Sequence, residues 1–176
     1  TLIIYMSDHG PAFPGAKTTT YDPGLRSPLI VRHPEAANDG RRIDAMISWV
    51  DITPTIMDFA QLPDPHPYGL ESDDGRGITT VERWHGKSFL PTLFDGVVEG
   101  FDEVYASHTF HEVQMYYPMR VVRERRFKLI WNIAHPLPFP FASDLWAAQT
   151  WQDRYEKGMD ASYGLRSVRD YIHRDE

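Results

Sequence analysis

The sequence predicts an α/β fold followed by a smaller module of strands and helices. Three observations lead to this prediction. An apolar segment at residues 1–6 opens into a polar loop, a segment with helix-start signals follows at 51–60, and an Asp95-Gly96 turn precedes further predicted strands. We therefore expect residues 1–97 to belong to a larger α/β domain and residues 98–176 to form a smaller domain.

The elements before the Asp-Gly turn are two strands and a helix. Residues 1–6 are apolar and β-prone, which predicts a buried strand, and residues 26–32 predict a second one. The helix at 51–60 is expected to have Thr53 at its N-cap and Pro54 at its first position. Its apolar face is expected to contain Ile56, Met57, Phe59 and Ala60.

Residues 63–77 carry Pro, Gly and Asp signals and predict a surface loop, and residues 86–94 predict a short amphipathic helical turn. Strands are then predicted at 103–107 and 119–132. In the second of these, most of the apolar side chains share one parity and are expected on one face: Val121, Phe127, Leu129 and Trp131.

The last segment, residues 144–172, has helical spacing with Leu145 and Ala148 among its apolar positions. The tryptophans of the second half are expected in the core rather than on a sugar-binding surface: Trp131, Trp146 and Trp151.

Composition excludes several classes of protein. The chain has 176 residues, 41% of them hydrophobic, which excludes a disordered polypeptide, and a net charge of -7, which argues against nucleic-acid binding. Its apolar runs are far shorter than the roughly 20 residues that span a bilayer. It contains no cysteine, so these residues hold no disulfide, thiolate metal site or cysteine nucleophile.

Asp8-His9-Gly10 is the strongest local signal for chemistry. These residues follow the first predicted strand, where open α/β sheets bind ligands. A carboxylate oxygen and an imidazole nitrogen suit a divalent cation, and Gly10 lets the backbone pass close to such a site. The alternative is an Asx-type turn at the end of a strand.

Lys17 lies in the loop that follows this motif. Its ammonium group could neutralise an anion beside the metal, whereas the alternative is a solvated surface lysine. His111 and Glu112 follow a predicted strand and could line a ligand pocket or, equally, pack at the surface. The basic run at 123–126 suggests contact with a polyanion, although a charged strand edge is its simpler interpretation.

Four ordered sequence blocks resemble the second half of a sulfatase. They are Ser7-Asp8-His9-Gly10, the block from Tyr21 to Pro34, Val50-Asp51-Ile52-Thr53-Pro54, and Gly86-Lys87-Ser88-Phe89-Leu90-Pro91. Further blocks, from Ser107 to Arg120 and at Pro138-Phe139-Pro140, are similar to the branch of that family that removes N-sulfate groups from glucosamine, the heparan N-sulfatases.

The resemblance implies hydrolysis of sulfate esters or N-sulfate groups of sugars such as glycosaminoglycans. It also implies an alkaline phosphatase-like sandwich followed by a smaller α+β C-terminal domain with an antiparallel sheet. His111 and Glu112 lie in the block from Ser107 to Arg120, so the resemblance suggests that they line the sugar pocket. By position, Asp8 and His9 would bind Ca²⁺, with Mn²⁺ or Zn²⁺ less favoured, and Lys17 would contact the sulfate. The nucleophile in this family is a formylglycine, which the resemblance places in an N-terminal half outside these residues.

Two positions depart from the N-sulfatase branch, because that branch usually has Asn at position 9 and Arg at position 17. The choice between sulfate ester and sulfamate therefore stays open. Two other functions also stay open: a phosphonate or phosphate ester hydrolase of the same superfamily, and a noncatalytic module that binds sulfated glycans. The family suggests a periplasmic, secreted or lysosomal location.

Overall fold

The computed structural model describes residues 1–36, 40–62, 70–73, 79–82, 85–96, 98–112 and 115–174. These residues form two compact units. The first comprises Thr1–Ile3 and Val31–Val104, and the second comprises Ile4–Ile30 and Tyr105–Glu176. The segment with the Asp8-His9 motif thus groups with the second half of the chain, and the expected boundary after residue 97 stays a prediction.

The two predicted N-terminal strands are present as β1 (Ile3–Met6) and β2 (Leu29–Arg32), which pair in a two-stranded sheet. The prediction that the first strand is buried was wrong for the described residues. In β1, exposed side chains alternate with half-buried ones, and Tyr5 is 67% exposed.

In the first unit, a one-turn 3₁₀ helix η1 (Trp49–Asp51) leads into α2 (Ile52–Phe59). The predicted N-cap at Thr53 was wrong, because the helical turns begin earlier, where Ser48 and Asp51 form a capping box. The predicted apolar face was also only partly correct, since Ile56 is 47% exposed while Thr55 is fully buried.

Buried polar contacts join α2 to the segment at residues 86–89. Asp51, only 6% exposed, accepts hydrogen bonds from the backbone nitrogens of Ser48 and Lys87. The Thr55 hydroxyl accepts one from the Phe89 nitrogen at 3.1 Å, and Gly86 lies so close to Val50 that a Cβ there would be 2.1 Å from its carbonyl oxygen. Asp51 therefore stabilises the fold by capping.

The first unit also contains β3 (Leu70–Asp73), β4 (Thr79–Glu82) and α3 (Thr92–Asp95). β3 and β4 pair antiparallel, so the loop predicted at 63–77 was wrong for residues 70–73; its other residues lie outside the described part of the chain. The helical turn predicted at 86–94 is present only as α3, at the end of that range.

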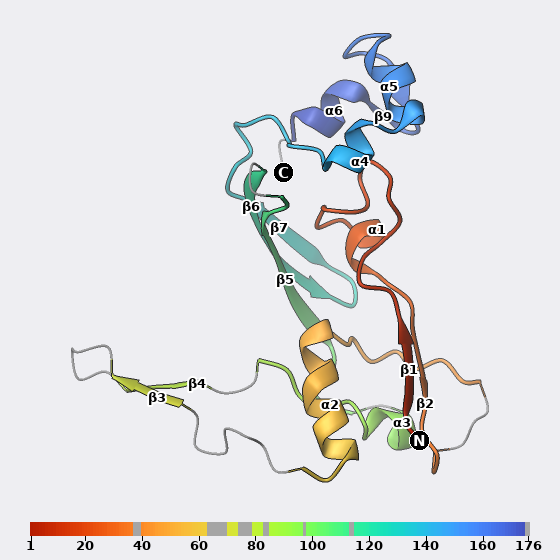
Figure 1. Ribbon diagram of the computed structural model, residues 1–176, viewed down its shortest axis with the longest axis vertical. Coiled ribbons are helices and arrows are strands. Elements are labelled where there is room, and N and C mark those ends of the chain that lie inside the picture. Colours follow the sequence, from red (N-terminus) through yellow and green to blue (C-terminus); the bar gives the residue numbers. More distant parts are fainter. Residues whose placement is uncertain are drawn as a thin grey trace. The chain divides into compact units, whose positions relative to one another are not determined.

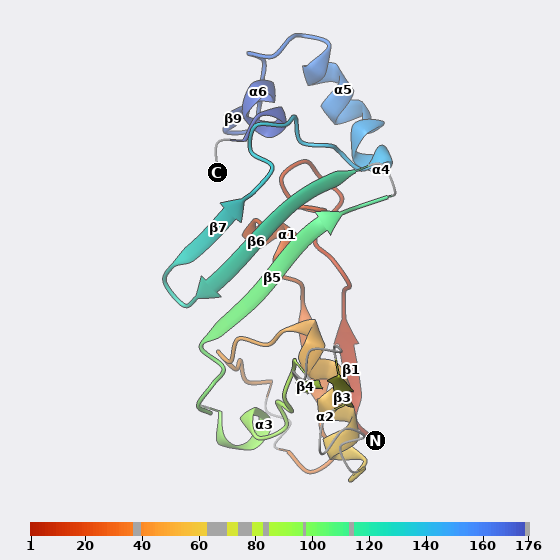
Figure 2. The ribbon, with the colours of Figure 1, turned by 90° about the vertical axis from the view of Figure 1, so that its left-hand side faces the viewer.

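The second unit contains the three-stranded sheet of β5 (Glu103–Phe110), β6 (Tyr116–Glu124) and β7 (Lys128–Asn132). Figure 2 shows that neighbouring strands of this sheet run in opposite directions. The antiparallel sheet predicted for the second part of the chain is therefore present.

The single parity predicted across 119–132 was wrong, because a turn divides this segment into two strands. Val121 faces Ile130 across the β6–β7 pair, and residues directly opposite each other share a face. Leu129 and Trp131 therefore point away from the buried Val121, and each is 64% exposed. The expectation that Trp131 belongs to the core was wrong for the same reason.

Short helices replace the continuous helical region predicted at the C-terminus. They are α4 (Ser143–Trp146), α5 (Gln149–Tyr155) and α6 (Val168–Ile172), with the small hairpin of β8 (Ser162–Tyr163) and β9 (Arg166–Ser167) before the last one. Figure 1 shows α5, α6 and β9 side by side in the blue part of the chain.

An aromatic core holds these helices to the sheet. Trp151 is fully buried, as predicted, and packs on Phe141 with ring centroids 4.6 Å apart. Burial of each large apolar side chain contributes about 1.5–3 kcal/mol. The core cluster comprises Tyr117, Met119, Ala134, Phe139, Phe141, Ala142, Leu145, Trp151 and Val168.

Candidate functional site

Two glycines, Gly10 and Gly24, close the loop after β1. Any other residue at either position would force the neighbouring backbone to move. The Gly10 nitrogen donates to the Gly24 carbonyl at 3.3 Å. A Cβ at Gly10 would lie 1.8 Å from the Pro23 carbonyl oxygen, and one at Gly24 would lie 2.3 Å from that of Ala16. These contacts hold the segment that begins with Asp8 and His9 against the short helix α1 (Asp22–Leu25).

Asp8 and His9 converge at the start of this loop. The His9 Nδ1 lies 2.6 Å from the Gly10 carbonyl oxygen, and its Nε2 lies 3.6 Å from an Asp8 carboxylate oxygen. Because a carbonyl only accepts hydrogen bonds, Nδ1 carries a proton, and Nε2 is the ring nitrogen on the side of Asp8. The Asp8 side chain is 86% exposed and the His9 side chain 45% exposed, so both donors are accessible.

This arrangement fits two ligands of one cation. Metal-binding histidines commonly donate their other ring N–H to a backbone carbonyl, which is the contact that His9 makes with Gly10. Two donors do not complete a coordination shell. Among the described residues, no cluster of three or more His, Cys, Asp and Glu side chains could hold a metal.

Lys17 is held by an ion pair rather than solvated. Its ammonium lies 2.6 Å from the Asp144 carboxylate, and only 17% of the lysine side chain is exposed. The hydrogen bond from Lys17 lowers the pKa of Asp144, so this carboxyl group is ionised at neutral pH. The next residue, Thr18, has a φ of 63°, a conformation that is costly for a β-branched residue and often found at functional sites.

Glu112 contacts the same short helix as Lys17. A Glu112 carboxylate oxygen accepts from the Ser143 hydroxyl at 2.9 Å and from its backbone nitrogen at 3.3 Å, and His111 Nε2 lies 3.9 Å away. Like Thr18, Glu112 has a positive φ, of 57°. Because Ser143 and Asp144 are consecutive, the first turn of α4 brings the predicted sulfate-contacting lysine close to the predicted sugar-contacting pair.

Sequence reasoning missed Ser143 and Asp144. Their only local signal was a Ser-Asp pair at the start of a helical region, which usually indicates capping. The pairing of Lys17 with Asp144 joins residues 127 positions apart and has no local signature. The structure brings Lys17, His111 and Glu112 to α4, and it brings Asp8 and His9 to each other.

His108 lies on β5, three residues before His111, and is a structural histidine. Its Nδ1 lies 2.8 Å from the Tyr117 carbonyl oxygen and therefore carries the proton. Its Nε2 is buried without a hydrogen-bond partner in the described part of the chain. Burial, together with the positive charges of His111 and Arg174, lowers the pKa of His108, so folding favours the neutral ring.

Acidification should therefore destabilise the fold through His108. A folded-state pKa below the ordinary 6.5 means that the unfolded chain binds more protons, so this contribution is present above pH 6.5 and is lost as the pH falls. We expect Tm to drop by a few degrees between pH 7.5 and 5.5. His108→Asn keeps a donor near Tyr117 and should reduce that drop, measured by thermal unfolding; an unchanged drop would contradict this assignment.

Comparison with known proteins identifies the family of the chain. A sequence model of the Sulfatase family matches residues 1–62. The chain is 35% identical over 178 residues to the human N-sulphoglucosamine sulphohydrolase. This match covers 99% of the chain and 34% of the human enzyme. The chain belongs to the sulfatase family. Its match to that human enzyme covers 99% of the chain and therefore both units.

Two bacterial relatives extend this finding to sulfatases of other stated specificity. This sulfatase chain is 31% identical over 134 residues to an ulvan-active sulfatase of Formosa agariphila, covering 75% of the chain and 23% of the relative. It is 31% identical over 135 residues to an N-acetylglucosamine-6-O-sulfatase of Bacteroides thetaiotaomicron, covering 74% and 22%. The chain thus spans about a third, or less, of the length of these relatives. In the described residues, no helix is long and apolar enough to cross a membrane.

Proposed function

We propose that this chain is part of a sulfatase that hydrolyses sulfate esters or N-sulfate groups of sugars. The observation that carries the proposal is the meeting of Lys17 and Glu112 at the first turn of α4, in a chain related to named sulfatases along nearly its whole length. The relatives named for glucosamine-based substrates favour an amino sugar.

Lys17 is proposed to contact the sulfate group. Charge builds on the sulfate oxygens as the S–O or S–N bond breaks, and a fixed ammonium group stabilises that charge without moving. Asp144 supports this role, because its carboxylate holds the Lys17 ammonium in place at 2.6 Å. His111 and Glu112 are proposed to contact the sugar, since both side chains are partly exposed beside the same helix.

Asp8 and His9 are proposed to supply two ligands of a divalent cation. Ca²⁺ is favoured by the family resemblance, whereas the imidazole nitrogen of His9 also suits Mn²⁺ or Zn²⁺. When bound, the cation would polarise the sulfate oxygens and favour the ionised form of a nearby hydroxyl group. The remaining ligands are proposed to lie outside these residues, because Asp8 and His9 make up only part of a coordination shell.

The nucleophile is also proposed to lie outside these residues. The chain has no cysteine and covers 34% of the human relative, which leaves most of that relative's length unmatched. We propose that an N-terminal half of the same enzyme supplies a formylglycine, completes an alkaline phosphatase-like sandwich and forms the rest of the substrate pocket. A periplasmic, secreted or lysosomal location is part of this proposal.

The direct test is sulfate release by the full-length protein. We expect release, measured by ion chromatography, from N-sulfoglucosamine or glucosamine 6-sulfate, and much less phosphate from glucosamine 6-phosphate. The isolated 176-residue chain should release none. Preferred release of phosphate would favour the phosphate ester hydrolase, and sulfate release by the isolated chain would contradict the placement of the nucleophile elsewhere.

A further inference from the structure

A basic cleft lies in the unit that contains Lys17, beside the candidate site described above. It has a volume of about 690 Å³ and is formed by the loop at residues 11–23, the β6–β7 hairpin, β9 and α6. Four cationic side chains line it: Arg123, Arg126, Lys128 and Arg166. The rings of Phe13, Tyr21 and Tyr171 line it as well. This combination of guanidinium groups and aromatic rings is unlike the acidic average of the chain, whose net charge is -7.

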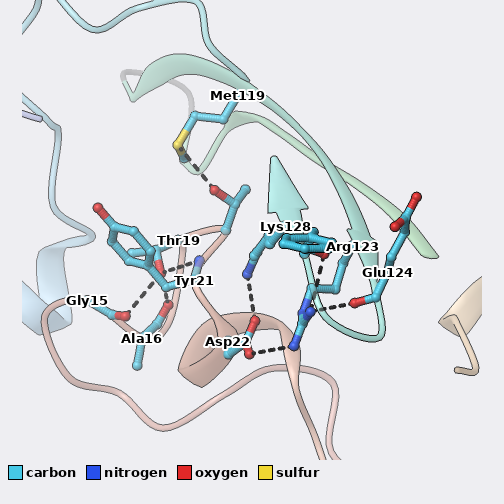
Figure 3. A network of polar contacts seen from close by, with 11 residues as sticks. Gly15, Ala16, Thr19, Tyr21, Asp22, Met119, Arg123, Glu124 and Lys128 are labelled. Atoms are coloured by element: carbon cyan, nitrogen blue, oxygen red, sulfur yellow. Dashed lines mark hydrogen bonds and ion pairs between the residues drawn. The ribbon is translucent and has the colours of Figure 1, made fainter. Parts of the chain in front are cut away.

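One carboxylate faces these cations. Among the described residues that line the cleft, Asp22 is the single acid; it pairs with Lys128 at 2.8 Å and with Arg123 at 3.5 Å. Figure 3 shows Asp22 between these two side chains. The hydrogen bond from Lys128 lowers the pKa of Asp22, so the acid is ionised at neutral pH. Even without Arg166, the three cations Arg123, Arg126 and Lys128 outnumber this one acid, which leaves positive charge for an anion to neutralise.

Contacts with Tyr21 hold the Arg166 side chain in place. Its guanidinium lies 5.0 Å from the centroid of the Tyr21 ring, and its Nη1 donates to the Tyr21 hydroxyl at 3.2 Å. The guanidinium of Arg174, a residue that is only 3% exposed, lies 5.1 Å from the centroid of the same ring. A guanidinium fixed in this way loses little side-chain entropy on binding and can contact a carboxylate or sulfate through two N–H groups.

The cleft and the candidate site share one loop. Residues 11–23 carry Lys17, which pairs with Asp144, and the same residues line the basic cleft through Phe13 and Tyr21. Phe13 is 56% exposed, and such a ring can pack against the apolar face of a sugar. A ligand that extends beyond the sulfate-contacting position thus has a cationic surface on the same loop.

We propose that this cleft binds an anionic segment, carrying sulfate or carboxylate groups, of the sugar polymer from which the sulfate is removed. This inference rests on the proposed function for the identity of the polymer. The cleft would then favour oligosaccharides over monosaccharides, because added contacts away from the reacting group strengthen binding of the longer substrate. The negative net charge of the chain disfavours nucleic acid as the alternative polyanion.

The test uses the full-length protein and a heparin hexasaccharide as the probe. Arg126→Ala combined with Arg166→Gln should weaken binding by about tenfold in isothermal titration calorimetry, because two charge contacts are lost. Lys157→Ala, which removes a cation outside the cleft, is the matched control and should change binding by less than about twofold. An unchanged affinity of the double variant would overturn the proposal.

A gain-of-affinity variant separates the charge effect from misfolding. Asp22→Asn removes the acid that competes for Lys128 and Arg123, so it should tighten hexasaccharide binding by about threefold. Raised salt should weaken binding, since these contacts are exposed. Equal binding of a neutral hexasaccharide, desulfated and with its carboxyl groups reduced, would overturn the role of charge, and equal binding of poly-glutamate would overturn the assignment to a sugar.

Turnover distinguishes this inference from the proposed function. In the Arg126→Ala, Arg166→Gln variant, kcat/KM should fall for the sulfated hexasaccharide and stay within about twofold for the monosaccharide. If the double variant turns over the monosaccharide and shows no loss of kcat/KM for the hexasaccharide, the proposed role of the cleft is overturned while the sulfatase activity stands. Absence of sulfate release from either substrate, with cleft-dependent binding intact, would overturn the sulfatase activity alone.

Discussion

Lys17→Ala in the full-length protein is expected to lower kcat/KM for a sulfated sugar by about 10²- to 10³-fold. This is the usual effect of removing one fixed group that stabilises charge in a transition state. The lysine side chain is only 17% exposed and its ammonium lies 2.6 Å from Asp144, so its position is set before substrate binds. Steady-state kinetics with glucosamine 6-sulfate or N-sulfoglucosamine would measure the loss.

Two further variants separate charge from packing at this position. Lys17→Arg keeps the positive charge and should recover much of the activity, whereas Asp144→Asn removes the ion pair but leaves the ammonium group in place. We expect Asp144→Asn to lower kcat less than Lys17→Ala does. A near-wild-type kcat/KM for Lys17→Ala would instead make the Lys17–Asp144 ion pair a purely structural contact.

Much of the fold could be predicted because local patterns determine it. Apolar patterns and helix-start signals predicted the strands β1 and β2 and the helix after Asp51. The antiparallel sheet of the second unit was expected from the family resemblance. The start of α2 was misplaced because Pro54 was assigned to the first helical position. The capping box of Ser48 with Asp51 starts the helical turns earlier, so Pro54 is the third residue of α2.

The orientation of the second-unit strands could not be predicted from parity alone. A turn at Arg125-Arg126 resets which residues face the core, so Leu129 and Trp131 are exposed although they share parity with buried Val121. Likewise, the helical spacing of 144–172 is compatible with several short helices, and only tertiary contacts such as those of Trp151 decide where they end.

For the candidate site, the sequence alone could predict the contact between Asp8 and His9 but not the contacts of Lys17 and Glu112. Asp8 and His9 are neighbours, so their convergence follows from a strand that ends in a loop closed by Gly10. The contacts of Lys17 and Glu112 with α4 cross more than 30 residues, and Ser143 and Asp144 carry no sign of them in the sequence. Resemblance to a family supplied those roles, and the fold supplies the contact.

Asp8→Ala is expected to remove the metal and the activity together from the full-length protein. Asp8 contributes the oxygen donor that faces His9 Nε2 at 3.6 Å, and loss of one carboxylate ligand commonly costs a hard cation most of its affinity. Elemental analysis should show a metal content near zero in the variant. Since the Asp8 side chain is 86% exposed, the fold itself should change little.

A thermal shift provides a readout of the metal that does not depend on turnover. A cation that binds only the folded protein raises Tm, by an amount that grows with its concentration over Kd. Added Ca²⁺ should therefore raise Tm of the metal-stripped wild type but not that of Asp8→Ala. Asp160→Ala is the matched control, because it removes a carboxylate that is 90% exposed and pairs with Arg169, away from the loop. Equal metal content and equal Tm shifts in wild type and Asp8→Ala would show that Asp8 and His9 form only a turn at the end of β1.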